Sequence, residues 1–268
     1  MLISSPQNPK IKSLKKLDKA SERREENIFV IEGMRELCLA DRAGYEIMEL
    51  FICEELLAQS ETYNLQKCQL KNTESYTITK AVYESLAYRG TTEGVIATAK
   101  PKQHLLNDLK LSACPLILVI EGVEKPGNLG AMLRTCDAAG IDAVIVCETK
   151  TDIYNPNTVR SSVGTVFTNH IAVAPSSEVL AFLREHHIKS YAAELTSTET
   201  YFQKDFSKPT AIVVGDEATG LSTEWMQAAD EHIKIPMLGE IDSLNVSVSA
   251  AILLYEVVRQ RGKALYTT

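Results

Sequence analysis

Short runs of apolar residues alternate with longer stretches of helical periodicity from Ile28 onward. In the first hundred residues, strand-like runs are expected at 28–33, 47–55, 75–79 and 94–99, and helical stretches at 34–44, 55–66 and 80–88. Alternation of this kind predicts a mainly parallel or mixed sheet with helices packed on its faces.

A polar, proline-flanked segment at 100–115 interrupts this pattern and is typical of a linker. The alternation then resumes, with strands expected at 116–122, 142–147, 167–174, 190–195, 210–217 and 231–237. Helices are expected after the glycine turn of 124–135 and at 157–164, 177–187, 222–230 and 245–263. The chain is therefore predicted to form two α/β domains, residues 1–105 and residues 113–268.

The composition argues against several classes of protein. The longest apolar runs are far too short to span a membrane, and the N-terminal stretch lacks the apolar core of a signal peptide. Six cysteines without a C-x-x-C pair favour reduced thiols in a cytoplasmic protein. The five histidines lack metal-ligand spacing, so no metal cofactor is expected.

Charge is distributed unevenly along the chain. Residues 1–24 carry a net charge of +5, whereas the whole chain carries −7. A basic arm on an acidic body is either a surface that contacts RNA phosphates or the solvated face of an amphipathic helix. The candidate phosphate contacts in the arm are Lys10, Lys12, Lys15, Lys16, Arg23 and Arg24.

Three loops at the predicted carboxyl ends of strands have unusual compositions, and ligands of open α/β sheets collect at these ends. In the first loop, "EKPGNLGAMLRT", Gly127 and Gly130 allow a tight turn and a close backbone approach. Asn128 is placed either to cap the following helix or to serve a site. Arg134 lies two turns inside that helix and faces either solvent or a ligand.

The second loop, "VVGDEATGLS", follows a strand that breaks at Gly215, and its paired acids Asp216 and Glu217 form either a solvated surface or an acidic site. The third loop, "IPMLGEIDSLNVSVSAA", leads through a glycine turn to Ser243 and Asn245. These two residues act either as an ordinary helix N-cap or as part of a site.

Taken together and in this order, the three loops resemble the signature motifs of the SpoU (TrmH-like) RNA 2′-O-ribose methyltransferases, a branch of the SPOUT superfamily. The resemblance covers roughly residues 114–263 and includes the runs N-L-G-A-M-L-R-T, G-D-E-x-x-G-L-S and I-P-M-x-G-x-x-x-S-L-N-V-S. "RSSVGTVF", beginning at Arg160, resembles the intervening R-x-S-x-G element of the family. Residues 1–105 resemble the RNA substrate-binding domain of its ribosomal RNA members.

The resemblance implies transfer of a methyl group from S-adenosylmethionine to a ribose 2′-hydroxyl, with 23S ribosomal RNA as the expected substrate and transfer RNA as the alternative. It also implies a C-terminal trefoil knot and a cytoplasmic homodimer with its sites near the interface. By position, it implies catalytic roles for Asn128, Arg134, Glu217, Ser243 and Asn245, S-adenosylmethionine binding by Gly215, Ile235 and Leu244, and RNA binding by Arg160. One departure is "GDEAT", which has Asp216 and Ala218 where relatives often carry Asn, Ser or Ala and then Gly.

The chemistry of this transfer agrees with the residue types. The site must orient the hydroxyl, remove its proton and hold the donor methyl in line, and none of these steps needs a metal. Arg134 suits a bidentate clamp on a neighbouring phosphate. The resemblance implies instead that it is the base, a role for which an arginine pKa must fall by ~5 units at a cost of about 7 kcal/mol. Both roles are open.

Two other classes of function remain as alternatives. A dinucleotide enzyme would use Glu148 to hold a ribose, but the chain lacks the G-x-G-x-x-G turn, and this reading leaves Ser243 and Asn245 unused. A non-catalytic RNA-binding protein would keep the fold, but retention of all the polar motif residues argues for an enzyme. The substantial N-terminal domain favours ribosomal over transfer RNA, because many members that act on transfer RNA have only short extensions.

Overall fold

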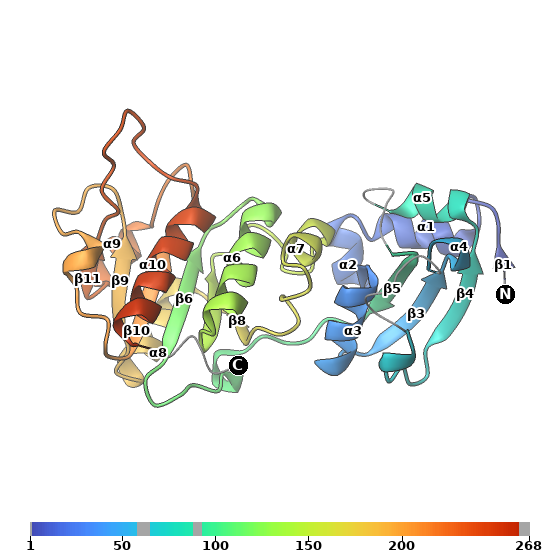
Figure 1. The fold of residues 1–268 in the computed structure, drawn as a ribbon, viewed down its shortest axis with the longest axis horizontal. Coiled ribbons are helices and arrows are strands. Elements are labelled where there is room, and N and C mark those ends of the chain that lie inside the picture. Colours follow the sequence, from blue (N-terminus) through green and yellow to red (C-terminus); the bar gives the residue numbers. More distant parts are fainter. Residues whose placement is uncertain (1, 58–64, 88–92, 263–268) are drawn as a thin grey trace. The chain divides into compact units, whose positions relative to one another are not determined.

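A computed structural model describes residues 2–57, 65–87 and 93–262 (Figure 1). The chain forms two compact units. The N-terminal unit contains residues 1–103 together with 152–168, and the C-terminal unit contains 104–151 together with 169–268. Each unit is built around its own sheet. The prediction of an α/β fold with an N-terminal and a C-terminal sheet is confirmed.

The N-terminal unit has a mixed five-stranded sheet of order β1-β4-β3-β5-β2. Strands β1, β4 and β3 run parallel, and β5 runs antiparallel to both β3 and β2. The strands are β1 (Leu2–Ile3), β2 (Phe29–Glu32), β3 (Ile47–Ile52), β4 (Glu74–Ile78) and β5 (Val95–Ala99). The helices are α1 (Pro9–Lys16), α2 (Ala20–Glu26), α3 (Met34–Arg42), α4 (Glu54–Leu57) and α5 (Lys80–Leu86), with a short 3-10 turn, η1 (Leu65–Lys67). The expected helix at 55–66 overlaps α4 and η1, and its residues 58–64 lie outside the described residues.

The basic arm is folded into this unit. Asn8 caps α1 by accepting a hydrogen bond from the Lys10 backbone N–H at 2.9 Å, and Pro9 occupies the first helical position, as helix N-termini favour. Ile11 and Leu14 are buried in the same cluster as Phe51 and Tyr83. The apolar side of α1 therefore fixes the arm to the sheet, and its lysines point outward.

Arg23 is an internal residue of the arm, with an exposed fraction of 3%. Its Nε donates to Asp152 at 2.8 Å, and its Nη1 donates to the carbonyls of Leu17 and Asp18 at 2.6 and 2.9 Å. This burial contradicts the prediction that Arg23 contacts an RNA phosphate. The guanidinium instead ties residues 152–168 to the N-terminal unit, since Asp152 begins that segment.

An aromatic cluster holds the same segment, which contains helix α7 (Pro156–Ser161). The ring of Phe29 stacks on that of Tyr154 at a centroid distance of 4.2 Å and lies 6.0 Å from that of Phe167. The hydroxyls of Tyr45 and Tyr154 are hydrogen-bonded at 3.1 Å. Burial around this pair raises the pKa of both tyrosines above its ordinary value.

The C-terminal unit has a fully parallel six-stranded sheet of order β11-β9-β10-β6-β7-β8. The strands are β6 (Leu116–Glu121), β7 (Ala143–Cys147), β8 (Ile171–Val173), β9 (Lys189–Ala193), β10 (Thr210–Val214) and β11 (Glu231–Ile233). The helices are α6 (Pro126–Ala139), α8 (Ser176–Glu185), α9 (Thr223–Ala228) and α10 (Val246–Gln260), with short 3-10 turns η2 (Leu106–Asp108) and η3 (Tyr201–Gln203). Strands β6 and β10 are neighbours at the centre, although about ninety residues separate them in sequence.

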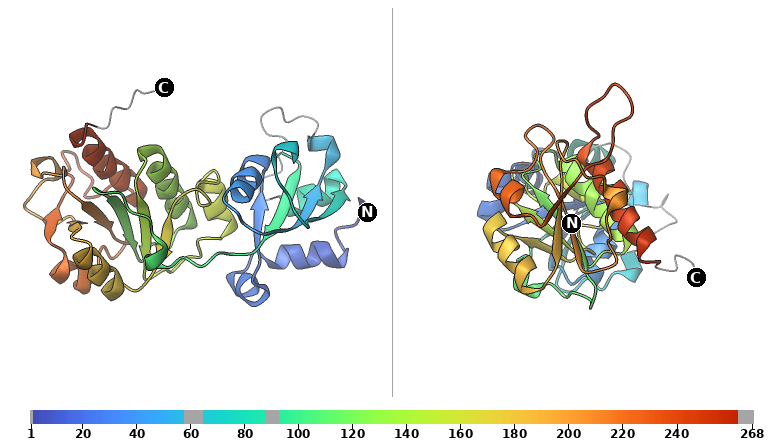
Figure 2. Two further views of the ribbon diagram at one scale, coloured as in Figure 1. Left: turned by 90° about the horizontal axis from the view of Figure 1, so that it is seen from below. Right: turned by 90° about the vertical axis from the view of Figure 1, so that its left-hand side faces the viewer.

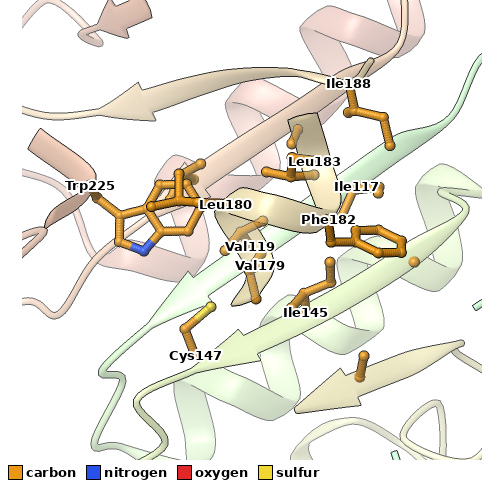
Figure 3. Close-up of a cluster of buried hydrophobic side chains, with 14 residues drawn as sticks. Ile117, Val119, Ile145, Cys147, Val179, Leu180, Phe182, Leu183, Ile188 and Trp225 are labelled. Atoms are coloured by element: carbon orange, nitrogen blue, oxygen red, sulfur yellow. The ribbon is translucent and has the colours of Figure 1, made fainter. Parts of the chain in front are cut away.

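Helices cover both faces of this sheet (Figure 2). On one face, α8 and α9 pack on β6, β7 and β10 in a core cluster that contains Ile117, Ile145, Phe182 and Trp225 (Figure 3). On the other face, α10 packs against α6, β6 and β10. The near-continuous apolar sequences of β6, β7 and β10 are thereby explained, because a parallel strand covered on both faces has no polar side.

Two further features of the described residues concern membrane-spanning helices and the cysteines. No helix among them is long and apolar enough to cross a membrane. The six cysteines are free thiols, and the Sγ atoms of Cys38 and Cys68 approach to 2.7 Å.

The buried ion pair of Arg23 yields a prediction about stability. Arg23→Ala leaves Asp152 and two backbone carbonyls without their donor, and breaking a buried pair of this kind costs about 3 kcal/mol. We expect urea unfolding of the N-terminal unit to shift by this amount. Arg24→Ala is the matched control: the neighbouring side chain is exposed, so a change within ~0.5 kcal/mol is expected. Equal effects of the two substitutions would contradict the structural role of Arg23.

Candidate active site

Three loops of the C-terminal unit meet at the carboxyl ends of the parallel strands. They follow β6, β10 and β11, the same loops that the sequence singled out. The chain leaves β11 at the sheet edge and then enters α10, which packs on β10, β6 and α6. The connecting segment 234–245 therefore returns toward the loops that follow β6 and β10, and Figure 1 shows it projecting beyond the sheet.

Glu217 is the centre of the polar cluster that joins these loops. Its Oε1 accepts hydrogen bonds from Nδ2 of Asn128 at 2.5 Å and from Nδ2 of Asn245 at 2.8 Å. Its Oε2 pairs with Nζ of Lys125, and the Asn245 amide also donates to Oδ1 of Asn128 at 3.2 Å. One residue from each of the three motifs is thus hydrogen-bonded within a single cluster.

Asn245 takes part in this cluster and also caps α10. Its Oδ1 accepts from the Ser247 backbone N–H at 3.0 Å, while its Nδ2 faces Glu217. Capping of α10 and membership of the Glu217 cluster are therefore compatible, because each uses a different atom of the amide. Asn128 does not cap α6: that helix begins after Lys125, and the Asn128 side chain is directed to Glu217 instead.

A cavity of about 420 Å³ lies beside the cluster, within the usual range for small-molecule sites. It is lined by residues 193–196 and 214–221, by Ser243, Leu244 and Val246, and by Met226, Ile235, Met237 and Ser249. The three predicted ligand-binding residues, Gly215, Ile235 and Leu244, all line it, as do Glu217 and Ser243.

The turn that carries Glu217 is tightly constrained. The backbones of Asp216 and Gly220 exchange hydrogen bonds of 3.1 and 2.9 Å across it. A Cβ added to Gly215 would lie 2.4 Å from the carbonyl of Gly220, so this position accepts only glycine. Oδ1 of Asp216 accepts from the N–H of Ala218 at 2.8 Å, and this hydrogen bond lowers the pKa of Asp216. The Asp and Ala of "GDEAT" are thus accommodated in a closed, hydrogen-bonded turn.

Ser243, Arg134 and Arg160 lie outside the Glu217 cluster. Ser243 bonds Oδ1 of Asp242 at 3.3 Å. Arg134 is exposed on α6, and among the described residues its side chain makes no hydrogen bond or ion pair. Arg160 belongs to the N-terminal unit, where it bonds Oδ1 of Asn157 at 2.7 Å and lines a separate cavity of about 210 Å³.

The basic residues of the arm differ in whether their charge is already paired with a carboxylate. Lys10 pairs with Glu49 at 2.6 Å and lies 3.8 Å from Glu74, and the hydrogen bond to Glu49 raises its pKa. Its charge is therefore largely compensated. The remaining members of the predicted set are exposed on α1 and α2: Lys12, Lys15, Lys16 and Arg24.

Lys125 is a member of the Glu217 cluster that the sequence did not single out. It directly precedes Pro126 and Asn128 in the first motif, and its ion pair with Glu217 raises the pKa of its ammonium. A Lys on a surface loop carries no specific sequence signal. Only its place next to the glycine turn pointed toward the site.

Glu148, the acid that a dinucleotide enzyme would need, is engaged elsewhere. Its Oε1 accepts from the backbone N–H of Ser176 at 3.1 Å, at the start of α8. Across the described ranges, no group of three or more His, Cys, Asp or Glu side chains is arranged to hold a metal ion.

These features define a class of protein: a doubly wound α/β domain whose site is assembled by loops at the carboxyl ends of its parallel strands, together with a second α/β unit. The chain belongs to the SpoU rRNA methylase family, whose model matches residues 115–255. Residues 8–97 match the MRM3-like substrate binding domain. The family resemblance identified from the three motifs is confirmed.

Similar proteins cover nearly the whole chain. The 23S rRNA (guanosine(2553)-2′-O)-methyltransferase RlmP of Bacillus subtilis (strain 168) is 30% identical over 257 residues, which is 95% of this chain and 98% of that protein. A solved structure described as an RNA 2′-O ribose methyltransferase is 39% identical and covers 97% of this chain and 99% of its own, with a TM-score of 0.84. The AdoMet-bound rRNA methyltransferase from Sinorhizobium meliloti, at 26% identity, covers 100% and 99%, with a TM-score of 0.86.

The double use of Asn245 yields a stability prediction. Asn245→Ala removes the cap of α10 and should lower the unfolding free energy of the C-terminal unit by ~1 kcal/mol in urea titrations. Asn245→Ser keeps a capping oxygen but loses the amide donor to Glu217, so its stability should stay within ~0.5 kcal/mol of the original. If serine destabilised as much as alanine, the cap would not be the main contribution of this residue to stability.

Proposed function

We propose that this protein transfers a methyl group from S-adenosylmethionine to a ribose 2′-hydroxyl in 23S ribosomal RNA. The observation that carries the proposal is the cluster of Asn128, Glu217 and Asn245 beside the 420 Å³ cavity. It is supported by the similar proteins named above, which methylate ribosomal RNA or bind AdoMet. The match of the N-terminal unit to a substrate-binding domain favours ribosomal over transfer RNA.

The cavity residues suit S-adenosylmethionine. The lining combines backbone groups of 193–196 and 214–221 with the apolar side chains of Met226, Ile235 and Leu244, a surface that fits a flat base with polar edges. Glycine at 215 keeps this part of the cavity wall closed on itself, since a Cβ there would collide with the Gly220 backbone. When bound, the donor supplies an electrophilic methyl on a sulfonium. Gly215, Ile235 and Leu244 would hold it.

The polar residues would orient the acceptor ribose. The two carboxyl oxygens of Glu217 are bonded by Asn128, Asn245 and Lys125, so these polar groups fix one another's positions. Ser243 lies on the cavity wall and offers a hydroxyl to either substrate. Arg134, exposed and without an ion-pair partner in the described part of the chain, is available for a phosphate or for the hydroxyl proton.

Dimerisation is part of the proposal. Val248 and Tyr255 on α10 are 45% and 43% exposed, and the helix lies on the sheet face that α6 also covers. A second copy of the chain packing on this face would cover these side chains. We further propose that the C-terminal segment passes through a loop to form a trefoil knot and that the protein acts in the cytoplasm.

The experiment that tests the function uses the full chain, S-adenosylmethionine labelled in its methyl group, and ribosomal RNA from cells that lack the protein. We expect label in 23S RNA as one ribose 2′-O-methyl group, mapped by its resistance to alkaline cleavage. Label only in transfer RNA would support the alternative substrate. Donor binding without transfer to any RNA would indicate a non-catalytic RNA-binding protein, and NAD binding in its place would indicate a dinucleotide enzyme.

Arg134 provides the sharpest test of the site residues. Arg134→Ala should keep its melting temperature and S-adenosylmethionine affinity, because the side chain is exposed and lies outside the cavity. Its methyl transfer should fall by roughly a hundredfold or more, the range for lost acid–base groups. If Arg134→Lys restores most activity, charge alone suffices. If it does not, the planar fork or a proton-accepting guanidine is required. Near-native turnover of Arg134→Ala would remove Arg134 from the site.

The exposed basic residues yield a prediction about salt dependence. Replacing Lys12, Lys15 and Lys16 by alanine should weaken RNA binding and reduce the slope of log affinity against log salt, by up to ~0.7–0.9 per lost contact. Lys10→Ala is the matched control from the same helix, since Glu49 and Glu74 already compensate its charge. An unchanged slope in the triple variant would leave α1 as a solvated helix.

A further inference from the structure

A buried carboxylate lies next to the candidate site without belonging to its polar cluster. Glu121 is the last residue of β6 and is 4% exposed. None of the ion pairs among the described residues involves it. A carboxylate taken out of water is strongly unfavourable unless its oxygens are hydrogen-bonded. The burial of Glu121 at the carboxyl end of a central strand therefore has to be explained by the groups that it binds.

Both oxygens of Glu121 accept hydrogen bonds from distant segments. Oε1 accepts from the hydroxyl of Ser176 at 3.0 Å, and Oε2 accepts from the backbone N–H of Ser222 at 2.7 Å. The indole N–H of Trp225 donates to the same Ser176 hydroxyl at 3.0 Å. Because an indole N–H can only donate, Ser176 must give its own proton to Glu121. The donor–acceptor order of the whole chain of bonds is thereby determined.

One of these partners, Ser222, adjoins the cavity proposed for S-adenosylmethionine. Ser222 is the N-cap of α9 and ends the loop whose residues 214–221 line the cavity. Glu217 lies in that same loop, five residues before Ser222. Glu121 itself leads directly into the loop 122–125, after which α6 presents Asn128. One side chain therefore connects the end of one motif loop to the beginning of another.

We propose that Glu121 is a positioning residue for methyl transfer. Its carboxylate fixes the loop 215–222 relative to the loop 122–125, and so holds Glu217 at the hydrogen-bonding distance of Asn128 and keeps the wall of the donor cavity in place. The Ser176–Trp225 pair orients this carboxylate from the side of α8 and α9; Figure 3 shows the Trp225 indole within that core. This inference rests on the function proposed above.

Glu121→Gln tests the proposal with little change in shape. One oxygen becomes an NH₂ group, which must then face either the Ser222 N–H or the Ser176 hydroxyl. Facing Ser222, it opposes a second donor; facing Ser176, it forces the hydroxyl to turn its proton away from residue 121. We expect the loop to shift, with a rise of about tenfold in the KM and the Kd for S-adenosylmethionine. A fall in kcat of up to ~100-fold is expected, the cost of misplacing reacting groups by about an ångström. The KM for RNA should stay unchanged.

Trp225 supplies a readout that does not depend on activity. It is the only tryptophan in the sequence, and its indole N–H is bonded within this network. Its fluorescence emission should shift in Glu121→Gln and also in Ser176→Ala, which removes the bridging hydroxyl and is the second variant should the first fold poorly. Glu178→Gln is the matched control, because it removes an exposed acid from the same first turn of α8.

The outcomes separate this inference from the proposed function. Positioning by Glu121 is supported if Glu121→Gln or Ser176→Ala shows both a shifted Trp225 emission and weaker binding of S-adenosylmethionine. Glu178→Gln should show neither change. Folded variants with unchanged donor affinity and unchanged kcat overturn it, even if their stability is lower. If the unsubstituted chain binds S-adenosylmethionine but methylates no RNA, the proposed reaction fails, while donor affinity and emission still decide the role of Glu121.

Discussion

The pairing of β6 with β10 is the constraint on which the site depends. The two strands run parallel in register from Leu116 opposite Thr210 to Ile120 opposite Val214, and both are buried along their whole length. Parallel strands in register end at the same level. The loops that follow them must therefore emerge side by side, and the distance between Asn128 and Glu217 is set by a backbone ladder that lies entirely inside the domain.

The third motif reaches the same place by a different route. Strand β11 lies at the far edge of the sheet, two strands away from β10, yet α10 packs on α6 and on β6. The burial of Leu253, Leu254 and Val257 on α10 fixes where that helix can lie. Its N-terminal end, and with it Asn245, is consequently delivered to Glu217. Core packing therefore places the third member of the cluster, since no strand pairing does so.

Much of this arrangement could be predicted from the sequence, and the remainder has identifiable causes. Alternating apolar runs located the strands, and glycine-rich loops with Asn, Asp and Glu marked the carboxyl ends where ligands bind. The strand β1 is two residues long and shows no periodicity, so it was not predicted. Lys125 and Glu121 were not singled out because a lysine before a turn and an acid after a strand are common. Their roles depend on Glu217, Ser176 and Ser222, which lie 55 to 101 residues away.

The basic arm illustrates the same limit for charge. Net charge along residues 1–24 predicts an attractive surface for phosphates, but charge counting does not tell which side chains are free. Arg23 and Lys10 differ from their neighbours only in position on α1 and α2, and this position directs one toward Asp152 and the other toward Glu49. Arg23 directly precedes the exposed Arg24, yet it is buried, because the carbonyls of Leu17 and Asp18 lie within reach of its guanidinium. Fewer basic side chains are therefore available to phosphates than the sequence count suggests. On α1 these are Lys12, Lys15 and Lys16, which are exposed, whereas Ile11 and Leu14 of the same helix are buried and hold it to its sheet.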